Sequence, residues 1–144
     1  MHIEQITPYL THKLRRDVLY PDQKIFEMEM AEDNEGVHFG VFRDNKLEAV
    51  VSLFQKGTDF QFRKLAVSLD MQKMGIGSSL LEYITEYARK NGGSRIWCNA
   101  RSTAIDFYLK ANYKQTGKLF SKNGIDYEIL EKPIAPAVNP QANY

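Results

Sequence analysis

The chain has 144 residues, 43% of them hydrophobic, and a formal net charge of +1. This length fits one domain with a buried core, and the composition is not that of a disordered chain. The balanced charge argues against nucleic acid and membrane surfaces as partners. A single cysteine, Cys98, excludes an internal disulfide and a cysteine-rich zinc site. Because no apolar run approaches the ~20 residues of a membrane span and the N-terminus lacks a secretory pattern, we expect a cytoplasmic protein.

The first elements are predicted to be a strand followed by two helices. Residues 2–6 suit a short strand. Thr11 is placed to cap a helix that ends before Pro21, and residues 23–31 are predicted to form a second helix. These helices precede a run of strands.

Apolar residues then alternate with polar ones over residues 37–41 and 47–53, which is the pattern of half-buried strands. Asp44 and Asn45 lie between the two segments and tolerate positive φ angles. We therefore expect a hairpin here.

The next strand, residues 59–67, changes its phase. Phe60 and Phe62 are apolar on even positions, whereas Leu65 and Val67 are apolar on odd ones. Either this strand is buried on both faces near its end, or a β-bulge around residues 63–64 inserts one unpaired residue.

A strand–helix–strand unit follows. An amphipathic helix is predicted over residues 75–91 and is ended by Gly92 and Gly93. Residues 96–100 form a strand that should run parallel to the strand before the helix.

The last elements are a helix and a hairpin. Ser102 or Thr103 is placed to cap the helix, which ends at Asn112. The sequence Asn123-Gly124 predicts the turn of the hairpin.

The fold class that these elements predict is α/β (α+β), with about seven mostly antiparallel strands and one central β-α-β crossover. Residues 1–132 would form the domain. Residues 133–144 contain several prolines and read as an extended tail.

The segment over residues 72–77 joins a strand to a helix start and holds Gly75 and Gly77. Unsatisfied N–H groups at a helix start favour an anion such as pyrophosphate, to which Lys73 could add a donor. The alternative is that the glycines only allow a tight turn. The spacing is not that of a P-loop or of the three-glycine dinucleotide fingerprint.

Residues 99–113 follow the second parallel strand and should open at the same sheet edge, where open sheets bind ligands. Tyr108 in this segment could donate a proton to a leaving group. It could equally be a packing residue with its hydroxyl satisfied.

Together these segments resemble the GCN5-related N-acetyltransferase (GNAT) superfamily, and in particular a bacterial subgroup of mostly unassigned substrate. The resemblance rests on Leu65-Ala66-Val67, on Gln-x-x-Gly-x-Gly over residues 72–77, and on Ala-x-x-Phe-Tyr-x-x-x-Asn-Tyr over residues 104–113. It covers residues 2–132.

The resemblance implies an acetyl-CoA-dependent N-acyltransferase without a metal, in which an amine attacks the thioester directly. Helices would cover both faces of the sheet. Acetyl-CoA would lie where the sheet splays between its fourth and fifth strands, and the bulge of the fourth strand is a feature of this family. Tyr108 would protonate the departing thiolate, and the Val67 N–H would polarise the thioester carbonyl. The residues implied in acetyl-CoA binding are Leu65, Ala66, Val67, Gln72, Lys73, Met74, Gly75, Ile76, Gly77, Ser78, Asn99 and Phe107.

Four positions depart from the family pattern. Leu69 replaces a frequent proline, Asn112 a glycine and Tyr113 a phenylalanine. Arg101 replaces an asparagine early in the last helix, which puts one expected CoA contact in doubt.

No side chain at residues 61–64 can act as the general base that several relatives carry there. A primary amine of pKa about 10 is only ~0.1% neutral at pH 7, a handicap of roughly 4 kcal/mol. Water chains are one alternative base. The candidate side chains, each of which also fits a structural role, are His38, Glu48, Asp59 and Glu128.

The acceptor is expected to be a small-molecule amine or a protein amine, and relatives suggest a homodimer. Cys98, in mid-strand, fits a core residue better than a nucleophile. A non-catalytic CoA-binding module and a generic nucleotide binder are the rival readings. Candidate contacts to an anionic acceptor are Arg15, Arg16, His38, Arg63 and Arg101.

Overall fold

The computed structural model describes residues 1–137, which fall into two compact units. The first contains Met1–Phe54 and Phe62–Glu82, and the second contains Gln55–Gln61 and the chain from Tyr83 onward. The strands form a seven-stranded sheet in the order β1-β2-β3-β4-β5-β7-β6. The predicted fold class, a mixed sheet with one crossover, is therefore confirmed.

The strands match the predicted segments closely. The strands β4 and β5 run parallel, whereas the pairs β1–β2, β2–β3, β5–β7 and β6–β7 are antiparallel. The strands are β1 (His2–Ile6), β2 (Val37–Arg43), β3 (Lys46–Lys56), β4 (Asp59–Val67), β5 (Arg95–Arg101), β6 (Lys114–Lys122) and β7 (Ile125–Pro133).

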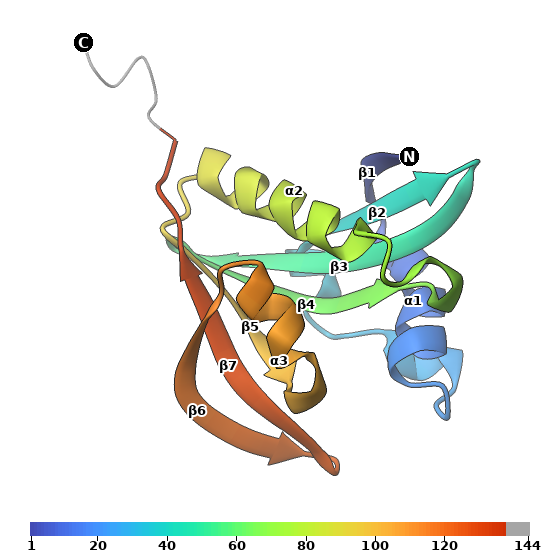
Figure 1. Ribbon diagram of the computed structural model, residues 1–144. Coiled ribbons are helices and arrows are strands. Elements are labelled where there is room, and N and C mark those ends of the chain that lie inside the picture. Colours follow the sequence, from blue (N-terminus) through green and yellow to red (C-terminus); the bar gives the residue numbers. More distant parts are fainter. Residues whose placement is uncertain (138–144) are drawn as a thin grey trace. The chain divides into compact units, whose positions relative to one another are not determined.

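The first helical region of the first unit is less regular than the sequence predicts. It consists of the 3-10 turn η1 (Pro8–Thr11), the short helix α1 (His12–Leu14) and the π-helical turn η2 (Arg15–Leu19). Figure 1 shows this region on one side of β2 and β3. Thr11 holds the N-cap position of α1, as predicted, but its side chain makes no cap hydrogen bond. Its buried hydroxyl instead donates a hydrogen bond of 2.6 Å to the Pro8 carbonyl.

The prediction of a second helix over residues 23–31 is wrong. Only the 3-10 turns η3 (Ile25–Met28) and η4 (Asp33–Glu35) form there. The Met28 carbonyl accepts a hydrogen bond from the Arg15 guanidinium, and the Met30 N–H donates to the Asp33 carboxylate. Buried side chains thus take up backbone groups that a helix would need for itself.

The predicted turns are confirmed by their backbone angles. Asp44 and Asn45 have φ angles of 51° and 66° between β2 and β3, and Asn123 and Gly124 have 53° and 77° between β6 and β7. Asn112, the predicted helix end, has a φ of 68°. Asparagine, aspartate and glycine tolerate this left-handed region best, which is why these turns were readable from sequence.

The phase change in β4 also has a backbone cause. Lys64 lies inside this strand with a φ of 57°, at the position where the alternation shifts. Upstream of it Phe60 and Phe62 are buried, and downstream the most buried residue is Ala66. An irregular strand, rather than burial of both faces alone, therefore explains the pattern.

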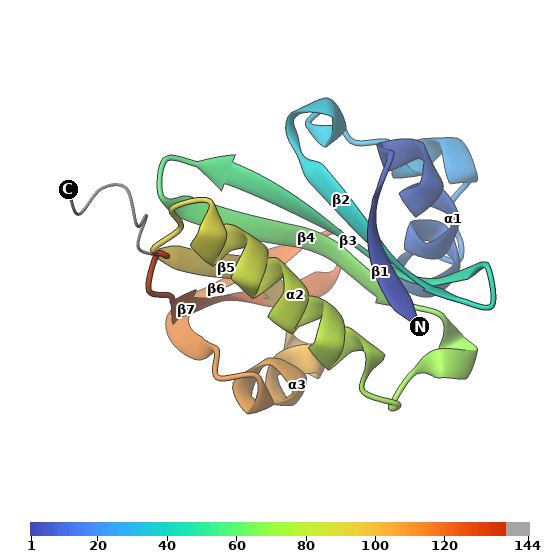
Figure 2. The same cartoon turned by 90° about the horizontal axis from the view of Figure 1, so that it is seen from above.

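In the second unit, β4 pairs with β5 in parallel over Asp59–Gln61 and Arg95–Trp97. The helix α2 (Ile76–Lys90) begins in the first unit, and Figure 2 shows its C-terminal half over β5, where Ile84 and Ala88 are fully buried.

The predicted last helix is a 3-10 turn, η6 (Ser102–Ala104), followed by α3 (Ile105–Lys110). Neither Ser102 nor Thr103 caps it, because Arg101 holds the capping position of η6 and no side-chain cap hydrogen bond forms. The extended Arg101 backbone is continuous with β5, so the strand runs directly into the turn.

The C-terminal segment continues beyond Pro133, the last residue of β7. The Ile134 N–H donates to the Ser94 carbonyl, and the Ala137 N–H donates to the Arg89 carbonyl. The rest of the predicted tail lies outside the described residues. Within residues 1–137, no helix is long and apolar enough to cross a membrane, and no cluster of metal-ligating side chains occurs.

Candidate functional site

The glycine turn lies in the first unit, after β4 and the 3-10 turn η5 (Leu69–Met71). Lys73 has a φ of 65° and Gly75 a φ of 82°, so the chain passes through two left-handed residues before α2. A Cβ added to Gly75 would meet no atom within 4 Å. Backbone conformation, and not close packing, is thus what requires glycine at this position within the protein.

The start of α2 presents free N–H groups at this turn. The first helical hydrogen bond runs from the Ser79 N–H to the Gly75 carbonyl, so the N–H groups of Ile76, Gly77 and Ser78 precede it. These groups carry the partial positive charge of the helix start. Lys73 and Ser78 are exposed beside them and can add donors to an anion.

The Gln72 side chain ties the turn to the end of β4. Its Nε2 donates a hydrogen bond of 3.0 Å to the Val67 carbonyl. The next residue, Ser68, donates its N–H to the Glu48 carbonyl. Among the main-chain groups of the residues that the resemblance implies in acetyl-CoA binding, the Val67 carbonyl therefore already has a donor. All the predicted binding residues from Leu65 to Ser78 belong to this one unit.

Tyr108 lies in the second unit on α3, within an aromatic group. Its ring contacts Phe107 and Tyr113 edge to face, with centroids 5.0 and 5.8 Å apart. Burial, followed by the neighbouring Cys98 and Tyr113, raises the pKa of the Tyr108 hydroxyl well above its usual range, although Arg101 opposes the shift. The phenol is therefore neutral at any physiological pH.

The other two predicted residues of this unit differ in exposure. Asn99 is exposed on β5, opposite Ile129 of β7, and can reach a ligand. Phe107 is half-buried against Tyr108. Both belong to the same unit as Tyr108, as their short separation in sequence implies.

Cys98 is poorly suited to nucleophilic chemistry. It is 2% exposed on β5, and burial raises the pKa of its thiol to about 12. Since the thiolate is the reactive form, a buried thiol of this pKa is inert at neutral pH. This agrees with the core role that the sequence suggested.

The four candidate bases all have structural partners. Glu48 accepts a hydrogen bond from Ser68, and Glu128 accepts two from Gln115 and from the Gly117 N–H. Asp59 forms a 3.7 Å ion pair with Arg95. His38 uses both ring nitrogens, toward Ser52 Oγ and the Asp33 carbonyl. All four therefore have a structural role in the fold, as the sequence also allowed.

The candidate contacts to an anionic acceptor are likewise engaged. Arg15 is fully buried and forms two hydrogen bonds with the Asp33 carboxylate, at 2.8 and 2.9 Å. Arg16 pairs with Asp17, and Arg63 reaches Glu32 at 3.4 Å. Arg101, at the end of β5, acts on the Tyr108 hydroxyl electrostatically. Arg15 and His38 are therefore parts of the core. No local pattern in the sequence indicates this, because Arg15 lies 18 residues from Asp33 and His38 lies 14 residues from Ser52.

One contact that sequence reasoning missed lies at the irregular position of β4. The Lys64 ammonium sits over the Tyr20 ring, 4.5 Å from its centroid, and donates a hydrogen bond to the Tyr20 hydroxyl. It anchors the end of the first helical region to β4. The only signal in the sequence was the phase change of this strand around residues 63–64.

Comparisons with known proteins agree with this arrangement. Residues 12–132 match a family model described as an acetyltransferase (GNAT) domain. The chain is 27% identical over 139 residues to the uncharacterized N-acetyltransferase YitI of Bacillus subtilis (strain 168), covering 90% of this chain and 93% of that protein.

Two solved structures are similar in fold. The aminoglycoside 6'-N-acetyltransferase from Enterococcus faecium has a TM-score of 0.78 at 21% identity, covering 96% of this chain and 100% of that one. A GNAT family acetyltransferase from Elizabethkingia anophelis with acetyl-CoA bound has a TM-score of 0.72 at 16% identity, covering 92% of this chain and 97% of that one.

Proposed function

Because this chain belongs to the GNAT acetyltransferase family and is an acetyl-CoA-dependent N-acetyltransferase, we propose that Tyr108 is its proton donor and residues 72–78 its pyrophosphate site. The observation that supports the proton donor is the buried, neutral Tyr108 phenol. The exposed turn with its free N–H groups supports the pyrophosphate site.

The residues of the turn fit an anionic group. The N–H groups of Ile76, Gly77 and Ser78 point from a helix start, and the positive φ of Gly75 exposes the backbone. Lys73 adds a positive charge. Acetyl-CoA, when bound, supplies the activated thioester that the amine attacks.

The raised pKa of Tyr108 limits how it acts. An ordinary thiol has a pKa of about 8.5, so full proton transfer from a phenol above 10 to a thiolate is uphill. The hydroxyl therefore acts first as a hydrogen-bond donor to the developing negative charge on sulfur. The hydroxyl then passes its proton to the sulfur and takes up the proton released by the attacking amine, so the thiol leaves protonated and the phenol ends neutral. Such donation contributes on the order of 100-fold to a rate.

The acceptor amine must lose its proton without a dedicated side-chain base. The candidate carboxylates and His38 each have a structural partner in the fold, so we take solvent water as the proton acceptor. We therefore propose that the chain selects the neutral fraction of its amine. Amines of low pKa should then react faster at neutral pH than amines of pKa about 10.

For the acceptor, we propose only the broad class of amines. Similar folds include an aminoglycoside 6'-N-acetyltransferase, a spermidine N-acetyltransferase chimera and the ribosomal-protein-S18-alanine N-acetyltransferase. Small-molecule amines and protein amines both remain candidate acceptors for this chain, and a homodimer is a further proposal.

The test of Tyr108 is CoA thiol release from acetyl-CoA with a panel of amines of graded pKa. Tyr108→Phe should lower kcat about 100-fold and leave the KM for acetyl-CoA within about twofold. Tyr113→Phe is the matched control, because it removes a hydroxyl from the same buried aromatic group and should keep kcat within about threefold of wild type.

Equal kcat values for Tyr108→Phe and wild type would exclude Tyr108 as the donor. CoA binding without turnover of any amine, together with no effect of Tyr108→Phe, would instead support a non-catalytic CoA-binding module.

A further inference from the structure

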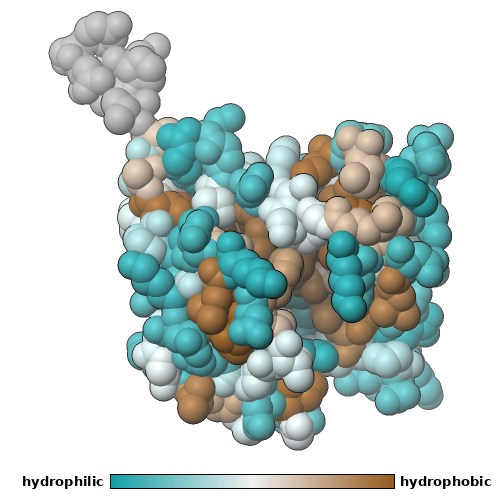
Figure 3. Space-filling view, viewed as in Figure 1, coloured by the Kyte–Doolittle hydropathy of each residue, from teal (hydrophilic) through white to brown (hydrophobic). Residues whose placement is uncertain are grey.

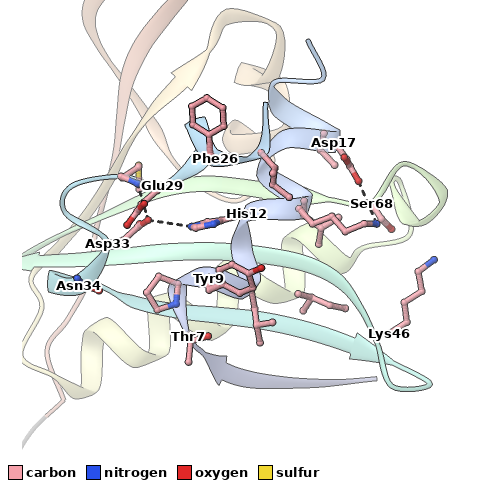
Figure 4. Close-up of a pocket in the computed structure, with 18 of the residues that line it drawn as sticks. Thr7, Tyr9, His12, Asp17, Phe26, Glu29, Asp33, Asn34, Lys46 and Ser68 are labelled. Carbon is pink, nitrogen blue, oxygen red and sulfur yellow. Dashed lines mark hydrogen bonds and ion pairs between the residues drawn. The ribbon is translucent and has the colours of Figure 1, made fainter. Parts of the chain in front are cut away.

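A cavity of about 1260 Å³ lies in the first unit, around α1. Its walls come from η1, α1, η3 and the segment that leads to η4, with Lys46 and Ser68 at one end (Figure 4). None of the residues proposed to bind acetyl-CoA lines it. Its size exceeds the roughly 300–1,000 Å³ typical of small-molecule sites, so a small organic ligand fits. We call it the α1 cavity.

Large apolar side chains are exposed around the α1 cavity. Tyr9 is 77% exposed and Phe26 71%, and Leu10, Ile25 and Leu69 are exposed as well. These five are nearly half of the eleven large apolar side chains exposed in the described part of the chain. Figure 3 shows hydrophobic atoms at the surface on the side where α1 lies. Exposed apolar groups that gather in one place mark a binding site more often than scattered ones do.

The inner wall of the cavity carries polar atoms. Figure 4 shows His12, Asp33 and Glu29 next to one another on this wall. His12 Nε2 is buried, has no hydrogen-bond partner, and lies 3.9 Å from Asp33 Oδ2, which is too far for a hydrogen bond. A buried nitrogen without a partner is costly, so a ligand that supplies one would be favoured.

The charges that remain unpaired around the cavity are acidic. Asp33 is neutralised by Arg15, Asp17 by Arg16 and Lys13, and Lys46 lies 3.5 Å from Glu48. Glu29 and Asp70 line the cavity, and no ion pair to either occurs within the described residues. An anionic ligand would be repelled, whereas a neutral apolar ligand would leave His12 Nε2 without a partner.

We propose that the α1 cavity binds a small organic cation, an ammonium group attached to an aromatic or aliphatic body. The ammonium lies between Glu29 and His12 Nε2 and donates hydrogen bonds to both. The apolar body packs on Phe26 and Leu10, and an aromatic wall also favours a cation. This site is separate from the residues proposed for acetyl transfer, and its binding needs no acetyl-CoA.

The experiment is isothermal titration with three probes of similar shape, in the absence of acetyl-CoA. 2-Phenylethylamine should bind at least tenfold more tightly than 2-phenylethanol or 3-phenylpropionate. Glu29→Gln should weaken binding of the amine at least fivefold. Glu35→Gln, the matched control, makes the same charge change on an exposed residue that does not line the cavity, and should bind like wild type.

Phe26→Ala is the second variant, and it should fold because this side chain is largely exposed. It should weaken all three probes and keep their order. Amide chemical shifts in a two-dimensional NMR spectrum should change most between Tyr9 and Asn34.

Equal binding of the amine and the alcohol, or no effect of Glu29→Gln, would overturn the proposal. Shift changes confined to other elements would do so too, because they would place the amine in an acceptor site. Thiol release from acetyl-CoA tests the proposed transfer separately, so either result can fail alone.

Discussion

At the scale of single residues, substitutions of Gly75 and Gly92 can distinguish the effect of backbone strain from an effect on ligand binding. Their φ angles are 82° and 81°, and a Cβ on either would meet no atom within 4 Å. Alanine at either position therefore costs stability only through its backbone, by about 1 kcal/mol. Gly75 lies in the proposed pyrophosphate turn, and Gly92 follows the other end of α2.

Gly75→Ala is accordingly expected to raise the KM for acetyl-CoA about tenfold, equivalent to ~1.4 kcal/mol, because the turn must shift to relieve the strain. Gly92→Ala should lose similar stability and keep its KM. Steady-state kinetics and urea unfolding of both variants check this. If the two variants raise KM equally, the turn has no special role in binding.

At the scale of elements, a buried polar group holds the first helical region to β2 and β3. Arg15 on η2 donates hydrogen bonds to Asp33, to Ser52 of β3 and to the Met28 carbonyl. His38 of β2 joins the same group through Ser52. Burial alone would raise the pKa of the Asp33 carboxyl, but hydrogen bonds from Arg15 and the Met30 N–H outweigh it and lower that pKa. Asp33 thus stays ionised to a lower pH than an ordinary aspartate would.

His38 makes this group sensitive to mild acid. Burial lowers the pKa of its imidazole below 6.5, against the opposing effect of Asp33. Between the folded pKa of His38 and pH 6.5, the unfolded chain binds a proton that the folded chain does not. The stability that His38 contributes is therefore complete above pH 6.5 and is lost as the pH falls toward the folded pKa.

Urea unfolding between pH 7.5 and 5 should show this loss, with a slope of at most ~1.4 kcal/mol per pH unit from His38. His38→Gln removes the titrating group, so its free energy of unfolding should change less over the same range, whatever its absolute stability. Parallel curves for wild type and His38→Gln would contradict the assignment.

At the scale of the whole molecule, CoA should stabilise the folded chain by mass action. At a CoA concentration 100 times its Kd, the free energy of unfolding should rise by ~2.7 kcal/mol, and Tm by on the order of 10 °C. ATP and NAD lack the pantetheine arm and should give a smaller shift at equal concentration. Thermal unfolding measures all three, with Gly92→Ala and Gly75→Ala compared at the same CoA concentration. Stabilisation by ATP or NAD but not by CoA would favour a generic nucleotide binder.

The regular strands, the turns and two parts of the candidate site were predictable, because each is encoded by residues that are close together in sequence. The residue types of Asp44-Asn45 and Asn123-Gly124 favour the positive φ angles that the turns need. The irregularity of β4 is visible in the alternation of its own apolar residues. The glycine turn and Tyr108 were found in the same way, from short motifs. The roles predicted for them remain proposals that the kinetic experiments test.

What the sequence by itself determined is therefore the succession of strands along the chain and the family pattern, whereas the segment that it predicts to bind acetyl-CoA remains a proposal. Only the tertiary structure decided what the buried charges do. Arg15, Asp33 and His38 are up to 23 residues apart in sequence, and the fold brings them together in the core. A 3-10 turn forms in place of a predicted helix, and Arg15 and His38, two predicted acceptor contacts, are buried. The α1 cavity has the same origin, because its walls come from segments that share no local pattern. The periodicity of apolar residues indicates which face of an element is buried, because it depends on neighbouring residues alone. The partner of a buried charge comes from another segment, so it depends on how the segments pack.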